Sequence, residues 1–278
     1  MDLTFETSPA RRRTAGRVAA ALVLAVLGAG LSGCGSAPKD EFAGMSTDKL
    51  YEDARDEQAS GNWERASKMF EKLEARAAGT PLAQQAQLDL AYTQYKANDK
   101  PAALATIERF IKLHPSSPAL DYAYYLQGLI NFNENLGLLG SLARQDLSER
   151  DQRASRDSYE SFRQLVRQFP DSKYAPDATL RMNYIVNTLA QYEVHVARYY
   201  YKRGAYVAAA NRAQQAVQEF QRSPAVEEAL YIMALSYDQL ALPELRDDAR
   251  RVLTASFPDS IYVKQGFVAP EKPWWQLW

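Results

Sequence analysis

The sequence predicts an all-α fold in which pairs of helices stack one on the next. Alanine, leucine, glutamine and arginine are abundant and runs of strand-forming residues are absent, which favours helices throughout. A phrase of proline and small residues recurs along the chain, first at residues 80–81 and last at residues 258–260. Because proline and serine end one helix and cap the next, this phrase marks the boundaries between helices.

A second phrase lies between these boundaries, a turn followed by a helix with small and aromatic residues at fixed spacing. Copies begin at residues 61–63, 98–100 and 204–206. The alternation resembles the tetratricopeptide repeat, a helix-turn-helix unit of ~34 residues whose small residues let paired helices approach closely. On that template Gly128 is the small residue of a first helix and Pro170 is a closing proline. We therefore expect a tetratricopeptide-repeat α-solenoid of about five units, the fifth irregular because Arg246 replaces an alanine.

Two features interrupt the repeat. In the third unit the surplus residues 133–154 are expected to form an inserted loop with a short helix, which is either functional or a tolerated surface insertion. In the fourth unit the first helix, residues 178–203, is too long, so it must project beyond its neighbours or bridge two halves of the solenoid. Its expected packing seam has heptad-like spacing: Met182, Ile185, Leu189, Tyr192, Val196, Tyr199 and Arg203.

The N-terminal segment has the layout of an export signal. Four arginines precede a short apolar run and a small-residue site that ends at Cys34, the only cysteine. The pattern resembles a bacterial lipobox, which implies cleavage before Cys34 and acylation of its thiol. The apolar run is shorter than the ~20 residues of a bilayer-spanning helix, which disfavours the alternative of a signal anchor. No aspartate follows in residues 35–36, so the resemblance implies a lipid-anchored protein at the periplasmic face of the outer membrane.

The chain is accordingly divided into four parts. Residues 1–33 are the signal peptide, 34–45 a flexible tether from the lipidated cysteine, 46–265 the solenoid and 266–278 a tail rich in proline and tryptophan. The tail is too short to span a bilayer and too aromatic for water. We expect it to dock on the solenoid, on a partner, or among lipid headgroups.

The composition and the motifs argue against nucleic-acid binding and catalysis. The formal net charge is −1, whereas phosphate binding needs a surplus of clustered Lys and Arg. We find no phosphate-cradling glycine loop, no zinc-spaced His/Cys set and no nucleophile elbow. The two histidines, His114 and His195, are interpreted as structural. We expect no catalytic residue, no metal and no cofactor, so an enzyme is not predicted.

Three groups of residues make a family resemblance specific. They are QLDLAYTQYK (87–96) with RFIKLHP (109–115), RDSYESF (156–162) with FPDSKYAPDA (169–178), and LAQYEVHVARYYYKRGAYVAAANRA (189–213). Together they resemble the BamD family, the tetratricopeptide lipoproteins of the β-barrel assembly machinery of Gram-negative bacteria. The resemblance implies a non-catalytic scaffold that engages a BamA-like barrel protein and other assembly-complex lipoproteins, and that receives unfolded outer-membrane proteins. Other solenoid lipoproteins, such as secretin or pilus pilotins and cell-envelope division adaptors, share the lipobox and the repeats and remain the alternative.

The resemblance also implies the residues that bind the barrel component. They are Tyr199, Tyr200, Arg203, Asn211 and Arg212. Arginine and aromatic side chains are the preferred anchors of protein interfaces. Charge reversal at Arg212 is expected to weaken capture of the partner with little loss of stability. In the alternative interpretation the tyrosines pack in the core and the two arginines hold the turn of their own unit.

The N-terminal units are expected to receive the substrate. The residues proposed for this role are Leu88, Tyr92 and Tyr95, with Trp63 and Phe70 as further candidates. Exposed aromatic side chains on stacked helices suit an extended peptide that ends in an aromatic residue. Trp63 and Phe70 occupy packing positions of the repeat, which favours a core role for both.

Overall fold

The computed structural model describes residues 41–132 and 149–264, and the chain separates into two compact units, 1–45 and 46–278. In the first unit, residues 41–45 form a turn in which the Met45 N–H donates to the Phe42 carbonyl at 3.0 Å. The described part of the second unit contains only helices: α2 (Thr47–Ala59), α3 (Trp63–Arg76), α4 (Pro81–Lys96), α5 (Lys100–Leu113), α6 (Leu120–Asn131), α8 (Glu149–Gln168), α9 (Ala175–Lys202), α10 (Tyr206–Glu219), α11 (Ala225–Gln239), α12 (Pro243–Ser256) and α13 (Ile261–Lys264).

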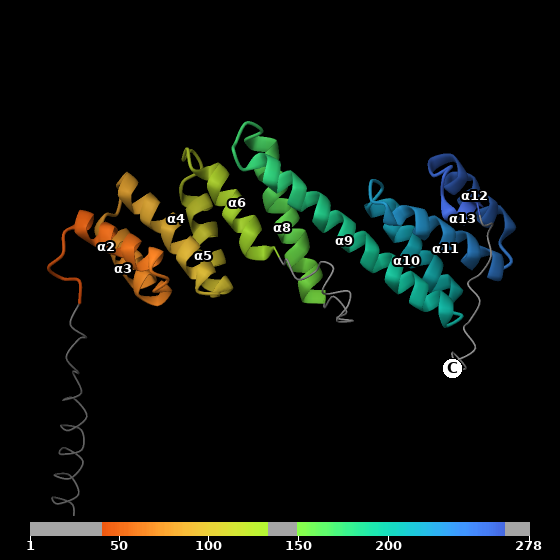
Figure 1. Cartoon of the computed structure of the whole chain (residues 1–278), viewed down its shortest axis with the longest axis horizontal. Coiled ribbons are helices and arrows are strands. Elements are labelled where there is room, and N and C mark those ends of the chain that lie inside the picture. Colours follow the sequence, from red (N-terminus) through yellow and green to blue (C-terminus); the bar gives the residue numbers. More distant parts are fainter. Residues whose placement is uncertain (1–40, 133–148, 265–278) are drawn as a thin grey trace, which may run out of the picture. The chain divides into compact units, whose positions relative to one another are not determined.

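The helices of the second unit pack in consecutive pairs. The pairs are α2 with α3, α4 with α5, α6 with α8, α9 with α10, and α11 with α12. The second helix of each of the first four pairs also packs against the first helix of the next pair, so the chain order is the spatial order (Figure 1). This arrangement confirms the predicted all-α, tetratricopeptide-type solenoid with five helix-turn-helix units among the described residues.

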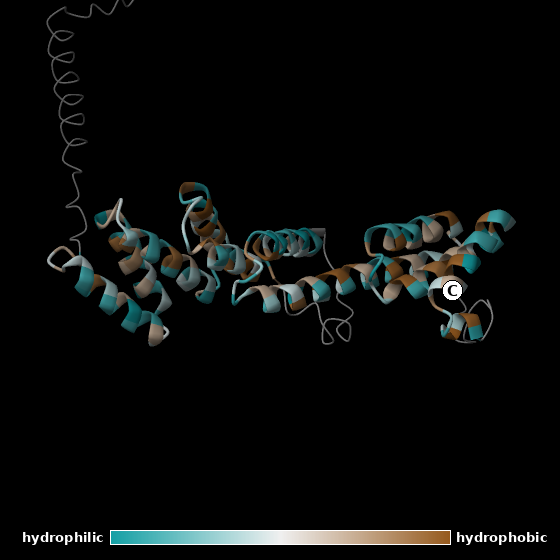
Figure 2. Cartoon of the chain, turned by 90° about the horizontal axis from the view of Figure 1, so that it is seen from above, coloured by the Kyte–Doolittle hydropathy of each residue, from teal (hydrophilic) through white to brown (hydrophobic). Residues whose placement is uncertain are grey.

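No described helix combines the length and the apolar character that a membrane crossing requires. Figure 2 shows polar and apolar residues interspersed along the helices, as expected where one side of a helix is buried and the other is solvated.

The turns between units repeat one hydrogen-bonded arrangement around a serine. The serine N–H donates to the carbonyl three residues earlier, and the serine hydroxyl accepts from the backbone N–H two residues later. The copies are Ser117 with Ala119, Ser172 with Tyr174, Ser223 with Ala225, and Ser260 with Tyr262. The recurring proline and serine phrase of the sequence is therefore a repeated turn. The short α13 begins at its last copy, as the first helix of a further unit would.

Small residues set the distance between paired helices, as the repeat template predicts. A Cβ atom added to Gly128 on α6 would lie 2.4 Å from Cε1 of Phe162 on α8. The Ser158 hydroxyl of α8 donates to the Gly128 carbonyl at 2.8 Å, which holds the two helices at this separation. Gly128 is therefore required by the close approach of the two helices.

The helix α9 has 28 residues and bridges the solenoid, as its length predicts. Its first half packs against α8 and its second half against α10 and α11, so it joins two apolar clusters. The heptad-like seam is wrong in the second half, where Tyr199 and Arg203 are exposed. The buried side chains there are Ala190, Glu193, Val194 and Ala197. The reason is that α10 presents alanines to α9, and small residues on both helices allow a closer contact than large heptad side chains.

The irregular parts of the repeat are only partly described. Residues 133–148 of the expected insertion lie outside the described residues, and residues 149–154 belong to α8 rather than to a loop. In the fifth unit Ala249, not Arg246, is buried, while Arg246 pairs with Asp238 and Asp247. The signal peptide, residues 34–40 of the tether and the tail lie outside the described residues.

Candidate functional site

The hairpin of α9 and α10 presents exposed aromatic and basic side chains at its turn. The exposed fraction of Tyr199 is 52%, and the guanidinium carbon of Arg203 lies 5.3 Å from the centroid of its ring. Arg203 ends α9, and Gly204 follows with a φ of +76°, a conformation that glycine adopts without steric cost. The hairpin turn therefore fixes the arginine over the tyrosine and leaves both in solvent.

The first turns of α10 extend this exposed region. Val207 is 59% exposed, and Asn211, one helical turn later, is also exposed. Val207 was not among the predicted site residues, although a β-branched residue four positions before Asn211 is a recognisable signal for a shared helix face. Tyr199, Arg203, Val207 and Asn211 are called the α9–α10 surface below.

The two remaining residues of the predicted partner site are more deeply placed. Tyr200 is half-buried, with its ring 5.8 Å from that of Tyr199, and it packs against the apolar cluster between α9, α10 and α11. Arg212 is 41% exposed, and its Nη1 lies 3.1 Å from Oε2 of Glu193, a buried carboxylate of α9. The structure thus places three of the five predicted residues in solvent and ties the other two to their own unit.

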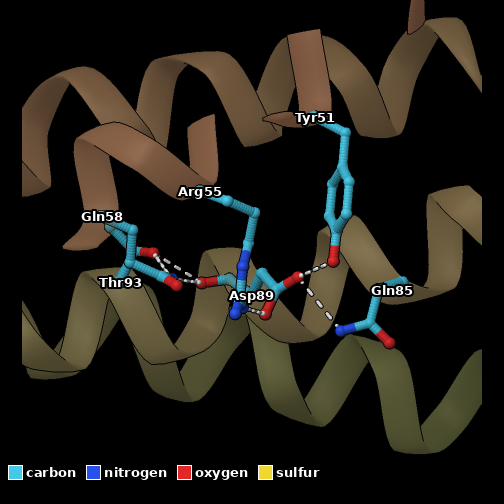
Figure 3. Close-up of polar contacts among 6 residues, drawn as sticks. All are labelled: Tyr51, Arg55, Gln58, Gln85, Asp89 and Thr93. Atoms are coloured by element: carbon cyan, nitrogen blue, oxygen red, sulfur yellow. Dashed lines mark hydrogen bonds and ion pairs between the residues drawn. The ribbon is translucent and has the colours of Figure 1, made fainter. Parts of the chain in front are cut away.

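A polar network joins the first helices of the first two units (Figure 3). Its centre is the buried carboxylate of Asp89 on α4. Oδ1 accepts from Arg55 Nη1 at 3.1 Å, while Oδ2 accepts from the Tyr51 hydroxyl at 3.2 Å and from Gln85 Nε2 at 3.0 Å. Burial raises the pKa of Tyr51, and the nearby Asp89 carboxylate raises it further. Asp89 was not predicted, although an acid between two leucines in a helical segment is a visible signal.

A second part of the same network lies deeper between α2 and α4. The side-chain amide of Gln58 donates to the Thr93 hydroxyl at 2.7 Å, and that hydroxyl donates to the Asp89 backbone carbonyl at 2.7 Å (Figure 3). The Gln58 amide and the Thr93 hydroxyl each donate to an acceptor, so this part of the network fixes the register of the two helices.

Tyrosines of α6, and of the turn just before α9, lie next along the solenoid. The ring of Tyr174, just before α9, lies 4.7 Å from Tyr125 and 5.6 Å from Tyr122, both on α6. The Tyr125 hydroxyl donates to Oδ2 of Asp177 at 2.7 Å. Burial raises the pKa of Tyr122, and the Asp89 carboxylate raises it further, so Tyr122 is electrostatically coupled to the polar network. Tyr92, Tyr122, Tyr125 and Tyr174 are called the tyrosine row below.

The predicted substrate residues fall into two groups. Leu88 is 3% exposed and belongs to the core between α4, α5 and α6, and Phe70 is fully buried. Neither offers a surface to a ligand, because Leu88 packs among apolar side chains of α5 and α6 and Phe70 is enclosed in the core. Tyr92 and Tyr95 are half-buried at the edge of that core, and Trp63 is half-buried with Lys96 Nζ 6.0 Å from its ring.

The other residues of interest lie elsewhere. Cys34 is outside the described residues. His114 ends α5 with its ring 5.0 Å from Phe110, and His195 is exposed on α9. Across residues 41–132 and 149–264, no group of three or more His, Cys, Asp or Glu side chains is arranged to hold a metal ion.

Comparison with known proteins gives consistent matches. Residues 43–253 match the family model of YfiO, described as an outer membrane lipoprotein. The chain is 48% identical over 262 residues to the outer membrane protein assembly factor BamD of Neisseria meningitidis serogroup B, covering 92% of this chain and 98% of the relative. It is 36% identical over 226 residues to the BamD of Xylella fastidiosa (strain Temecula1), covering 81% and 77%. These relatives are named as assembly factors rather than enzymes. The chain belongs to the BamD (YfiO) family of outer membrane lipoproteins.

Proposed function

We propose that this lipoprotein is a non-catalytic scaffold of the β-barrel assembly complex, attached to the periplasmic face of the outer membrane through lipid on Cys34. The names of its relatives support the assembly role over that of a secretin pilotin or a division adaptor. The lipobox-like residues before Cys34 support the anchor. The described helices contribute exposed aromatic and apolar side chains, which are suited to protein binding.

The α9–α10 surface is the proposed contact with the BamA-like barrel component. The observation that carries this assignment is the exposed Tyr199 with Arg203 held over its ring. Tyrosine and arginine are enriched among the central anchors of protein interfaces, and the stacked contact holds the two side chains in place. Val207 adds an exposed apolar side chain on the adjoining helix.

The tyrosine row and the Asp89 network are the proposed contact with unfolded outer-membrane proteins. Tyrosine offers a flat apolar ring and a hydroxyl, which suit an extended polypeptide of variable sequence. Arg55 keeps half of its side chain exposed while one nitrogen binds Asp89, so it retains donors for a carbonyl or carboxylate of the substrate. Because Asp89 fixes Arg55 and Tyr51 in place, the surface is ordered before substrate arrives.

Replacement of Tyr92 by alanine is expected to weaken binding of a peptide from the C-terminus of an outer-membrane protein by roughly fivefold, as for a tyrosine anchor worth ~1 kcal/mol. Fluorescence anisotropy with the full-length protein measures the change. Tyr237→Ala removes a comparably half-buried tyrosine from α11 and should leave affinity unchanged. Equal losses in both variants would place the substrate contact elsewhere.

Replacement of Cys34 by alanine is expected to abolish lipid attachment, leaving a soluble, uncleaved or mislocalised protein that still folds. The physical reason is that the acyl chains supply the membrane affinity, at ~0.8 kcal/mol for each buried CH₂ group. Metabolic labelling with palmitate, membrane fractionation and circular dichroism check these outcomes. A variant that still incorporates palmitate would refute the assignment of Cys34.

A further inference from the structure

Glu193 is a carboxylate on the buried face of α9, where its neighbours are small or apolar. Ala190, Val194 and Ala197 share this face. Val194 and Ala197 are buried in the cluster with α10 and α11, and Ala190 is buried in the cluster with α8. Glu193 itself is 3% exposed. A buried carboxylate carries a large desolvation cost unless it is paired. Arg212 of α10 supplies the pair, with Nη1 3.1 Å from Oε2.

Packing between α9 and α10 does not by itself require this ion pair. Apolar replacement of a buried ion pair is often neutral or stabilising, because the desolvation cost disappears with the charges. The surrounding contact is already made by alanines of both helices. A different ion pair on α9 has a clear structural role: Arg198 donates through Nε and Nη2 to both oxygens of Glu228 on α11, at 2.7 Å each. Packing therefore does not explain why the Glu193–Arg212 pair is present.

The geometry leaves much of the Arg212 guanidinium available. Within the described part of the chain its two contacts, to Glu193 and to Gln215 Oε1 at 3.5 Å, both run through Nη1. The side chain remains 41% exposed. An arginine fixed at one nitrogen loses less conformational freedom when its other nitrogens bind a partner.

We propose that Glu193 is a positioning residue for the partner interface, which holds the Arg212 guanidinium so that its outer N–H groups meet an acceptor on the barrel component. This inference rests on the proposed function, because it needs the α9–α10 hairpin to be the binding element. It assigns the buried acid a role in affinity rather than in stability.

Two replacements of Glu193 test the inference in the full-length protein. Glu193→Gln keeps the size and removes the charge, and Glu193→Leu replaces the acid by an apolar residue. Both should retain helical circular dichroism, and the leucine variant should unfold at the same or a higher temperature. Affinity for the purified periplasmic domain of the barrel component should fall roughly threefold to tenfold, the effect of losing one pre-ordered side chain. In an Arg212→Ala background neither replacement should lower affinity further.

The controls separate the possible outcomes. Glu228→Gln, on α11, breaks the ion pair with Arg198 of α9 and should leave affinity unchanged. If Arg212→Ala weakens binding but Glu193→Gln does not, Glu193 has no positioning role and the proposed function stands. If Arg212→Ala binds like the unmodified protein, the hairpin assignment fails and the inference fails with it. Should the leucine variant not fold, the glutamine variant decides the question.

Discussion

Replacement of Arg212 by glutamate is expected to lower the stability of the fold as well as the capture of the barrel component. The change places a second carboxylate beside Glu193, which is 3% exposed and loses its cation. Breaking a buried pair costs 3–5 kcal/mol, and we expect about 3 kcal/mol because Arg212 is partly exposed. The sequence alone suggests little loss of stability, and the buried acid corrects that expectation. Thermal and denaturant unfolding of the full-length protein measure the change.

Arg203→Glu is the matched control. It makes the same change of charge on an exposed arginine that stacks on Tyr199 and has no ion pair among the described residues. It should weaken capture while leaving the unfolding midpoint close to that of the unmodified protein. An unchanged unfolding midpoint for Arg212→Glu would mean that the buried Glu193 carboxylate does not need Arg212 as its cationic partner.

Replacement of Gly128 by alanine is expected to destabilise the third unit by about 2–3 kcal/mol, the upper part of the range for overpacking a close-packed core. The new Cβ would lie within 2.8 Å of three ring atoms of Phe162, whose ring is fully buried. The helices α6 and α8 would have to separate, which also strains the hydrogen bond from Ser158 to the Gly128 carbonyl. Chemical denaturation followed by circular dichroism gives the magnitude.

Two further variants make this prediction specific. Gly44→Ala adds a Cβ that meets no atom within 4 Å and should be nearly neutral. Phe162→Leu in the Gly128→Ala background removes the clashing ring and should recover part of the loss. A Gly128→Ala protein as stable as the original, or a loss that Phe162→Leu does not relieve, would contradict the close approach described here.

The fold could be predicted because its signals are local. The proline and serine phrase is a hydrogen-bonded turn in four places, and the small residue Gly128 lies where two helices touch. The seam of α9 could be predicted only in its first half. Further along, the buried face follows the alanines of α10, and a heptad pattern within α9 contains no information about that partner helix.

The candidate sites were predicted less completely, for the same reason. The family resemblance indicates Tyr199 and Arg203, which the structure leaves exposed. It also indicates Leu88, which is buried in the core shared by α4, α5 and α6. Glu193 and Asp89 look like surface acids in the sequence, yet both are buried. Glu193 faces α10 of its own pair, and Asp89 faces α2 of the preceding pair. Burial of a charged residue depends on the facing helix, so pattern analysis of a single helix does not reveal it.

Photo-cross-linking from α10 tests the central claim most directly. The photoreactive residue p-benzoylphenylalanine is placed at Val207, 59% exposed, and at Leu113 on α5, 60% exposed, in otherwise unmodified full-length protein in cells. The proposed function predicts that position 207 cross-links to the barrel component, identified by mass spectrometry, and that position 113 does not. A cross-link to the barrel component from position 113 alone, or a secretin as the product from position 207, would contradict it.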